Sequence, residues 1–136
     1  MVPRFRGRNI ETGEWVYGHL FYFNDGRHFI SPKGTDVVGG YGGAPAKYRL
    51  ENLVCFEIVP ETVGQSTGLK DLKGVEIFEG DIIVWEYSEK PQEVFWDNSI
   101  CGFSTKHYHL WRTVKKVKVI GNIYENPELL EPANEN

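Results

Sequence analysis

The sequence predicts a mainly β fold. Aromatic residues make up 14% of the 136-residue chain, and aromatic and β-branched side chains favour strands. These residues occur in short runs separated by Gly, Pro, Asn and Asp, which is typical of strands joined by tight turns. Few segments show the hydrophobic period of a helix.

One stretch near the middle of the chain contains the clearest entry into a strand. The segment Val75 to Phe78 leads through Glu79-Gly80-Asp81 into the apolar run Ile82 to Trp85. Glycine adopts a positive φ without steric cost, and aspartate can accept a hydrogen bond from its own local backbone. We therefore predict a tight turn with Gly80 at positive φ and Asp81 as its cap.

Residues 1–60 predict an N-terminal antiparallel β segment. Arg4, Arg6 and Arg8 share one face of its first strand, because side chains alternate between the two faces of a strand. We interpret that face as solvated, as charge runs usually are, and the alternative is an anion-binding edge. A strand from Trp15 to Phe23 carries apolar groups on both faces, so we expect it to be sandwiched or to meet a partner subunit.

Three local signals describe the rest of this segment. Asn24-Asp25-Gly26 predicts a hairpin turn. Residues 31–47 are rich in Gly and Pro and predict a long loop; they lack the Gly-Lys-Ser/Thr ending of a phosphate-binding loop, which argues against that interpretation. Leu53 to Val59 predicts a strand, which Pro60 ends because proline donates no hydrogen bond.

Residues 61–130 predict a small five-stranded barrel. We expect residues 131–136 to form a disordered tail. We also expect the whole chain to form one compact unit. Short strands alternate with turns here, and Gly102 inside one of them indicates the sharp bend that a small barrel needs. The predicted barrel core consists of Trp85, Phe95 or Trp96, Phe103 and Val119.

Several segments together resemble the pattern of the YopX family. They are ETVGQSTGLKD (Glu61 to Asp71), G-x-EIFEGDII from Gly74, VIGNIYENPELL (Val119 to Leu130) and the start FRGRNIETGEWVYGHL (Phe5 to Leu20). The resemblance implies a small phage, prophage or mobile-element protein with a β-rich fold and a small SH3-like barrel in its C-terminal half. We therefore predict N-terminal antiparallel strands packed on a C-terminal SH3-like small barrel. It implies no reaction, so no catalytic residues are carried over.

Charge and composition limit the classes of function. The net charge of −4 argues against a general nucleic-acid binder that relies on phosphate neutralisation, but it is compatible with a local basic face. Residues 1–20 do not form a signal peptide, so we expect Cys55 and Cys101 to be free cytosolic thiols. No apolar run is long enough to span a bilayer. We therefore expect a soluble protein in the cytoplasm of a bacterial host.

Few side chains are candidates for metal binding or nucleophilic catalysis. His107 and His109 project to one side of an extended segment and are the best metal candidates, with Cys101, Asp97 or His28 as the completing ligand. We favour solvent-facing histidines, because the chain lacks a paired Cys-x-x-Cys motif. Cys101 with either histidine would make a catalytic dyad, but we favour a small buried hydrophobe at this position.

A group of carboxylates lies around the central turn, at Glu76, Glu79, Asp81 and Glu86. Such a group suits divalent-ion binding or general acid–base catalysis, but without a second cluster we interpret it as surface solvation. We therefore predict a protein that is not an enzyme and has no cofactor and no metal site.

The C-terminal half also contains basic and aromatic residues that together form a candidate partner or nucleic-acid face. They are Tyr108, Trp111, Arg112, Lys115, Lys116 and Lys118. Aromatic rings can stack on bases while lysines follow a phosphate backbone. The alternative, which we favour, is that the lysines mark the solvated face of the last strand and protect its edge.

The resemblance implies a non-catalytic phage or prophage accessory protein that works by binding, and we expect a protein-interaction module. Its partner would be a host or phage protein, and the apolar strand Trp15 to Phe23 also predicts a homo-oligomer. The alternative is a small barrel that binds nucleic acid, and a metal protein or enzyme is the third hypothesis.

Overall fold

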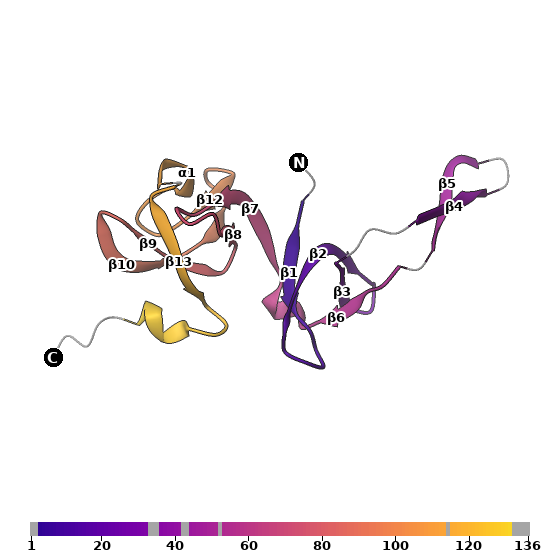
Figure 1. Ribbon diagram of the computed structural model, residues 1–136, viewed down its shortest axis with the longest axis horizontal. Helices are drawn as coiled ribbons and strands as arrows, with labels where there is room; N and C mark the ends of the chain where they lie inside the picture. Colours follow the sequence, from indigo (N-terminus) through magenta and orange to yellow (C-terminus); the bar gives the residue numbers. More distant parts are fainter. Residues whose placement is uncertain (1–2, 33–35, 42–43, 52, 114, 132–136) are drawn as a thin grey trace. The chain divides into compact units, whose positions relative to one another are not determined.

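The structure of the protein is a computed structural model that describes residues 3–32, 36–41, 44–51, 53–113 and 115–131. The chain divides into two compact units, residues 1–63 and 64–136. Strands dominate both units, and the described residues contain one short α-helix (Figure 1). The predicted mainly β fold is therefore confirmed. Except for Glu131, the predicted disordered tail lies outside the described residues.

The N-terminal unit is built on an antiparallel sheet in the order β6-β3-β2-β1. The strands are β1 (Phe5–Arg8), β2 (Trp15–Tyr22), β3 (His28–Ser31) and β6 (Phe56–Ile58), and a 3-10 turn, η1 (Pro60–Thr62), follows. Ile30 and Ile58 are fully buried in it. The predicted hairpin between β2 and β3 is confirmed, with Gly26 at a φ of 93°.

The arginine face of β1 differs from its prediction. The guanidinium of Arg6 lies 4.7 Å from the centre of the Trp15 ring, and that of Arg4 lies 5.4 Å from the Tyr17 ring. Arg6 is buried, so the prediction of a solvated face is wrong at this position. The register pairs Arg6 with Tyr17 and Arg8 with Trp15, which places cations and aromatic rings on one face of the sheet.

The glycine-rich segment also differs from its prediction. Residues 36–41 and 44–51 form an antiparallel hairpin of two strands, β4 (Asp36–Tyr41) and β5 (Ala44–Glu51), where we expected a long loop. The register shifts between Val38 and Gly40 and again between Gly40 and Tyr41. Glycine accommodates such bulges readily, so these glycines interrupt a ladder without preventing it.

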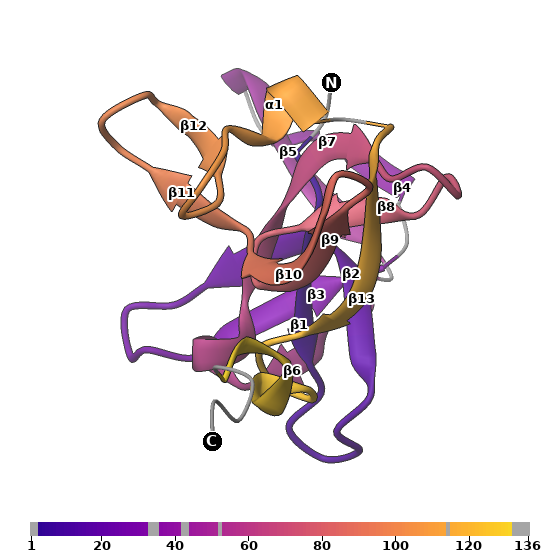
Figure 2. The same ribbon diagram turned by 90° about the vertical axis from the view of Figure 1, so that its left-hand side faces the viewer.

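The C-terminal unit consists of small antiparallel sheets. In the first, β7 (Gly64–Lys70) pairs with β8 (Glu76–Phe78). In the second, β9 (Asp81–Trp85) lies between β10 (Ser88–Glu93) and β13 (Val117–Asn122). In the third, β11 (Phe95–Asp97) pairs with β12 (Gly102–Ser104). The short helices are α1 (Leu110–Thr113) and the 3-10 turn η2 (Pro127–Leu130). Figure 2 shows β13 running beside β9. Within the described residues, these ladders do not close into the predicted barrel.

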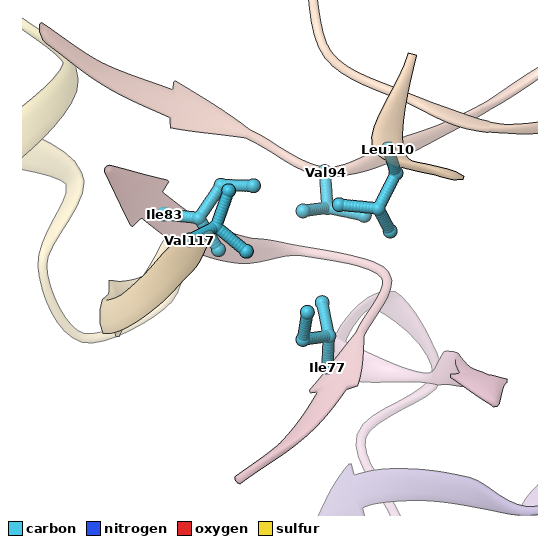
Figure 3. Close-up of a cluster of buried hydrophobic side chains, with 5 residues drawn as sticks. All are labelled: Ile77, Ile83, Val94, Leu110 and Val117. Atoms are coloured by element: carbon cyan, nitrogen blue, oxygen red, sulfur yellow. The ribbon is translucent and has the colours of Figure 1, made fainter. Parts of the chain in front are cut away.

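One hydrophobic cluster joins these sheets. Its fully buried members are Ile77, Ile83, Val94, Leu110 and Val117, which converge from β8, β9, the link between β10 and β11, α1 and β13 (Figure 3). The predicted core residues Trp85, Phe103 and Val119 pack against its edge, whereas Trp96 is exposed. Large aromatic side chains are rarely buried completely, and the centre of this small core is aliphatic.

The predicted turn at Gly80 and Asp81 is confirmed. Gly80 has a φ of 92°, and Asp81 Oδ2 accepts a hydrogen bond from the Phe78 backbone N–H at 2.7 Å. Gly80 N–H donates to Val94 O, and Gly80 O accepts from Ile123 N–H, both at 2.9 Å. The turn therefore ties the end of β8 to the segments that follow β10 and β13.

Candidate functional site

The predicted aromatic and basic residues gather around α1 and the adjoining ends of β9 and β13. α1 is a single helical turn, and Leu110 and Thr113 are its buried residues. Trp111 and Arg112, which lie between them, are exposed. Burial of Leu110 in the core thus fixes which side of the turn faces solvent. We define the aromatic–basic face as the exposed residues Tyr87, Trp111, Arg112, Lys115, Lys116 and Lys118.

Trp111 is the largest exposed group of this face. Its side chain is 62% exposed, and the guanidinium of Arg112 lies 5.3 Å from the ring centre. The His109 ring lies nearly parallel to the indole, at 11° and with centroids 6.4 Å apart. Trp111 is therefore supported by its neighbours but retains a large accessible surface.

Tyr87 is the second exposed aromatic residue, and the sequence analysis did not identify it. It is 68% exposed, and Lys116 Nζ lies 5.7 Å from its ring centre. Its ring lies nearly perpendicular to that of Trp85, with the two centroids 5.2 Å apart. Tyr87 follows β9, and the Glu86 N–H donates to Lys116 O at 2.9 Å. This backbone bond holds the end of β9 beside the start of β13 and so brings Tyr87 to Lys116.

Tyr108 belongs to the core edge and not to the exposed face where we predicted it. Its ring lies 5.4 Å from that of Trp85, and both rings pack against the hydrophobic cluster. The Tyr108 hydroxyl and Trp85 Nε1 are buried and have no hydrogen-bond partner among the residues that the structure describes. Burial raises the pKa of Tyr108 above its ordinary value. Tyr108 therefore packs between the core and the aromatic–basic face, and its ring is not available to stack on a ligand.

The lysines occupy distinct positions at this end of the unit. Lys118 is exposed on β13, whereas Val117 beside it is buried, as the alternation predicted. Lys115 has a φ of 68° and lines a surface cavity of about 590 Å³ together with Leu69 and Leu72. With Arg112 and Lys116, the face carries four cationic side chains, and Glu86 is an exposed carboxylate in the same region.

The structure separates the two histidines proposed as metal ligands. His107 lines a cavity beside Phe95, whereas His109 stacks on Trp111 and its Nδ1 lies 3.3 Å from Ser104 Oγ. Within the described residues, no three His, Cys, Asp or Glu side chains converge as a metal site would require.

The candidate nucleophiles are placed unfavourably for catalysis. Cys101 is exposed, with a φ of 51°, and its Sγ lies 3.7 Å from Asn98 O, so the prediction of a buried hydrophobe is wrong. The tight turn of the β11–β12 hairpin explains this position. Ser104, which contacts His109, is buried, and its hydroxyl also contacts the carbonyl oxygens of Thr105 and Tyr108. A hydroxyl held in this way is a structural link between loop segments.

The carboxylates around the central turn are mostly bonded to the chain. Glu76 Oε2 accepts from Ser66 Oγ at 2.6 Å, and Glu79 Oε1 accepts from the Gln65 N–H at 3.3 Å. Asp81 is buried and caps its turn. The prediction of surface solvation is therefore wrong for Asp81, because this carboxylate is buried and bonds to the backbone of its own turn.

Other polar residues in the segments that resemble the YopX family also stabilise turns. Asp71 accepts three backbone N–H bonds, including one of 3.0 Å from Val119. Asn126 Oδ1 accepts from the Asn122 N–H at 3.2 Å, and a Cβ at Gly121 would clash with the same oxygen. This turn therefore suits a glycine at position 121 and an amide side chain at position 126.

The geometry defines a class of small, mainly β protein with two units and an exposed aromatic–basic face. The family model described as "YopX protein" matches residues 4–131, so the chain belongs to the YopX family. The crystal structure of protein EF1440 from Enterococcus faecalis is similar, with a TM-score of 0.64 and 27% identity over 96% of this chain and 99% of that one. A comparison with curated proteins finds no match. Among the described residues, no helix is long and apolar enough to cross a membrane.

Proposed function

We propose that this protein is a non-catalytic accessory protein of a phage or prophage that binds a host or phage protein in the bacterial cytoplasm. The observation that carries this proposal is the pair of exposed rings, Trp111 and Tyr87, each contacted by a cationic side chain. Tryptophan, tyrosine and arginine are the residues that most often dominate binding energy at protein interfaces. The surrounding lysines favour a partner segment rich in carboxylates.

The placement of the reactive side chains supports a role without catalysis. Cys101 lies in an exposed turn, and the buried Ser104 hydroxyl is bonded to backbone carbonyls. A nucleophile needs both access to substrate and a positioned base. Neither group combines these two conditions.

The proposal is tested by capture from host lysate on the immobilised full-length protein, followed by binding measurements with the purified captured protein. Trp111→Ala and Tyr87→Ala remove exposed side chains, so each should weaken binding by about tenfold or more without lowering the melting temperature. Trp96→Ala is the matched control, because it removes an exposed aromatic ring from the β11–β12 hairpin. Equal binding by all four proteins would refute this face as the interface.

A second candidate function, binding of single-stranded nucleic acid, is favoured by the accessible Trp111 ring beside Arg112. Stacking of bases on such a ring tolerates many sequences, and lysines such as Lys116 and Lys118 would follow the phosphates. Fluorescence anisotropy with labelled single-stranded DNA and RNA separates the two functions. Nucleic-acid binding should weaken with salt, with a log–log slope of about −0.7 per phosphate contact. Capture that survives nuclease treatment favours a protein partner.

A further inference from the structure

A cavity in the C-terminal unit lies among β10, the start of β11, the loop before α1 and the end of η2. Its volume is about 480 Å³, which falls within the range of small-molecule sites. None of the residues of the aromatic–basic face lines it. It is therefore a separate feature of the unit.

The wall of this cavity includes a glutamine that is almost entirely buried. Gln92 is only 6% exposed and lines the cavity. Its backbone pairs with Ile83 in the ladder of β10 and β9, which fixes its position. A side-chain amide that lines a cavity can donate to and accept from a ligand placed there.

Basic side chains line the cavity from two segments. Lys90 comes from β10, where the register shifts between Ser88 and Gln92, and Lys106 and His107 come from the loop that follows β12. All three side chains are exposed. Because two segments contribute them, an anionic group in the cavity would be contacted by more than one donor.

The remaining walls provide an apolar surface and one carboxyl group. Phe95, Pro91 and Leu130 contribute the apolar part, and Glu93 lies beside Gln92. Burial, together with the nearby carboxylate of Glu79, raises the pKa of Glu93 above its ordinary value. The cavity therefore offers an apolar wall, the Gln92 amide and two lysines among its lining residues.

We propose that this cavity binds a nucleoside phosphate. The base would pack against Phe95, and its polar edge would bond to the Gln92 amide. The phosphate would lie near Lys90, Lys106 and His107. The same chemistry is presented by a free nucleotide and by a nucleotide of a single strand. The site does not depend on the proposed protein-binding face.

The proposal is tested by recording ¹⁵N–¹H NMR spectra of the full chain during titration. The probes are AMP, GMP, CMP and UMP, the matching nucleosides, inorganic phosphate, and a short single-stranded oligonucleotide. At least one mononucleotide should shift the amide signals of residues 90–93 and 106–107. The matching nucleoside and inorganic phosphate should each have an affinity lower than that of the mononucleotide by about tenfold or more, because each lacks one half of the ligand. Comparison of the mononucleotide with the oligonucleotide separates the two sources.

Variants locate the site within the unit. Lys106→Glu should weaken binding by about tenfold or more, because it reverses a charge that lines the cavity. Lys70→Glu is the matched control, since it makes the same charge change at an exposed position on β7 outside the cavity, and should alter the affinity by less than about twofold. The proposal is overturned if no mononucleotide shifts these signals, if inorganic phosphate binds equally well, or if the shifts map to residues 108–118. Titration of the unmodified protein decides the matter even if a variant fails to fold.

Discussion

Replacing Asp71 by Asn should destabilise the protein more than any surface substitution. Asp71 is buried, and its Oδ1 accepts backbone bonds of 2.8 Å from Lys73 and 2.9 Å from Val75. Its Oδ2 accepts from Val119, which lies 48 positions away in the sequence, at 3.0 Å. One carboxylate thus holds its own turn and ties that turn to β13.

The magnitude follows from the hydrogen bonds. Asparagine has one oxygen, so its NH₂ group must face at least one of the three backbone N–H donors. A hydrogen bond to a charged group contributes about 1.5–3 kcal/mol, and the bonds that remain would weaken by about 1 kcal/mol each on losing the charge. We therefore expect Asp71→Asn to lower the free energy of unfolding by about 3–5 kcal/mol.

The same residue should make stability depend on pH. Burial alone raises the pKa of Asp71, but the backbone N–H groups of Val119, Val75 and Lys73 outweigh it and lower the pKa below its ordinary value. A lowered folded-state pKa means that the stabilisation is present above the ordinary pKa of 3.8 and is lost as the pH falls through the folded-state value. The difference between Asp71→Asn and the unmodified protein should therefore shrink in acid.

Urea-induced unfolding, followed by tryptophan fluorescence at pH 7 and in a series of acidic buffers, measures both effects. Asp97→Asn is the control, because the Asp97 pKa is also lowered, through bonds from the Ser99 side chain and backbone, but in an exposed turn. It should leave the midpoint nearly unchanged. The reasoning is refuted if Asp71→Asn unfolds at the same urea concentration as the unmodified protein at pH 7, or if its deficit is undiminished in acid.

Three further outcomes are expected. Gly80→Val should lower stability by about 1–3 kcal/mol in urea unfolding, because valine is strained at a φ of 92°, and an unchanged midpoint would contradict this. Intact-mass measurement without reductant should show Cys55 and Cys101 as thiols, whereas a loss of two protons would indicate a disulfide. Light scattering at micromolar concentration should show a homo-oligomer that Tyr22→Lys dissociates, since Tyr22 is 71% exposed on β2; a monomer mass for the unmodified protein would be evidence against it.

Local signals in the sequence were sufficient to predict the strands on either side of the turns at Gly26 and Gly80, and the turns themselves. The turn at Gly80 and the hairpin at Gly26 were predictable because the required backbone geometry favours glycine. The β4–β5 hairpin was not, because its bulged ladder contains the glycines that usually mark a loop. A strand there depends on pairing between two segments, and the composition of either segment alone does not reveal it.

The candidate site was predictable in its residue types but not in its geometry. Tyr108 and Tyr87 both lie near lysines in the sequence, yet one packs on the core and the other is exposed. The difference arises because Leu110, in a single turn of helix without a sequence period, is drawn into the core and fixes its neighbours. The cavity beside Gln92 combines side chains from four separate segments, so no local pattern could identify it.

The polar side chains that carry the family resemblance have mainly structural tasks. Asp71, Asp81 and Asn126 all bond to backbone groups, and each holds a turn in place. Trp111 and Lys106 lie outside the segments that resemble the family. Trp111 is exposed on the short helix α1, and Lys106 is exposed on the loop that follows β12. Substitutions in the first group should therefore change stability, and substitutions in the second should change binding at constant stability. The shared segments specify a scaffold, and the identity of the partner depends on the side chains that this scaffold presents.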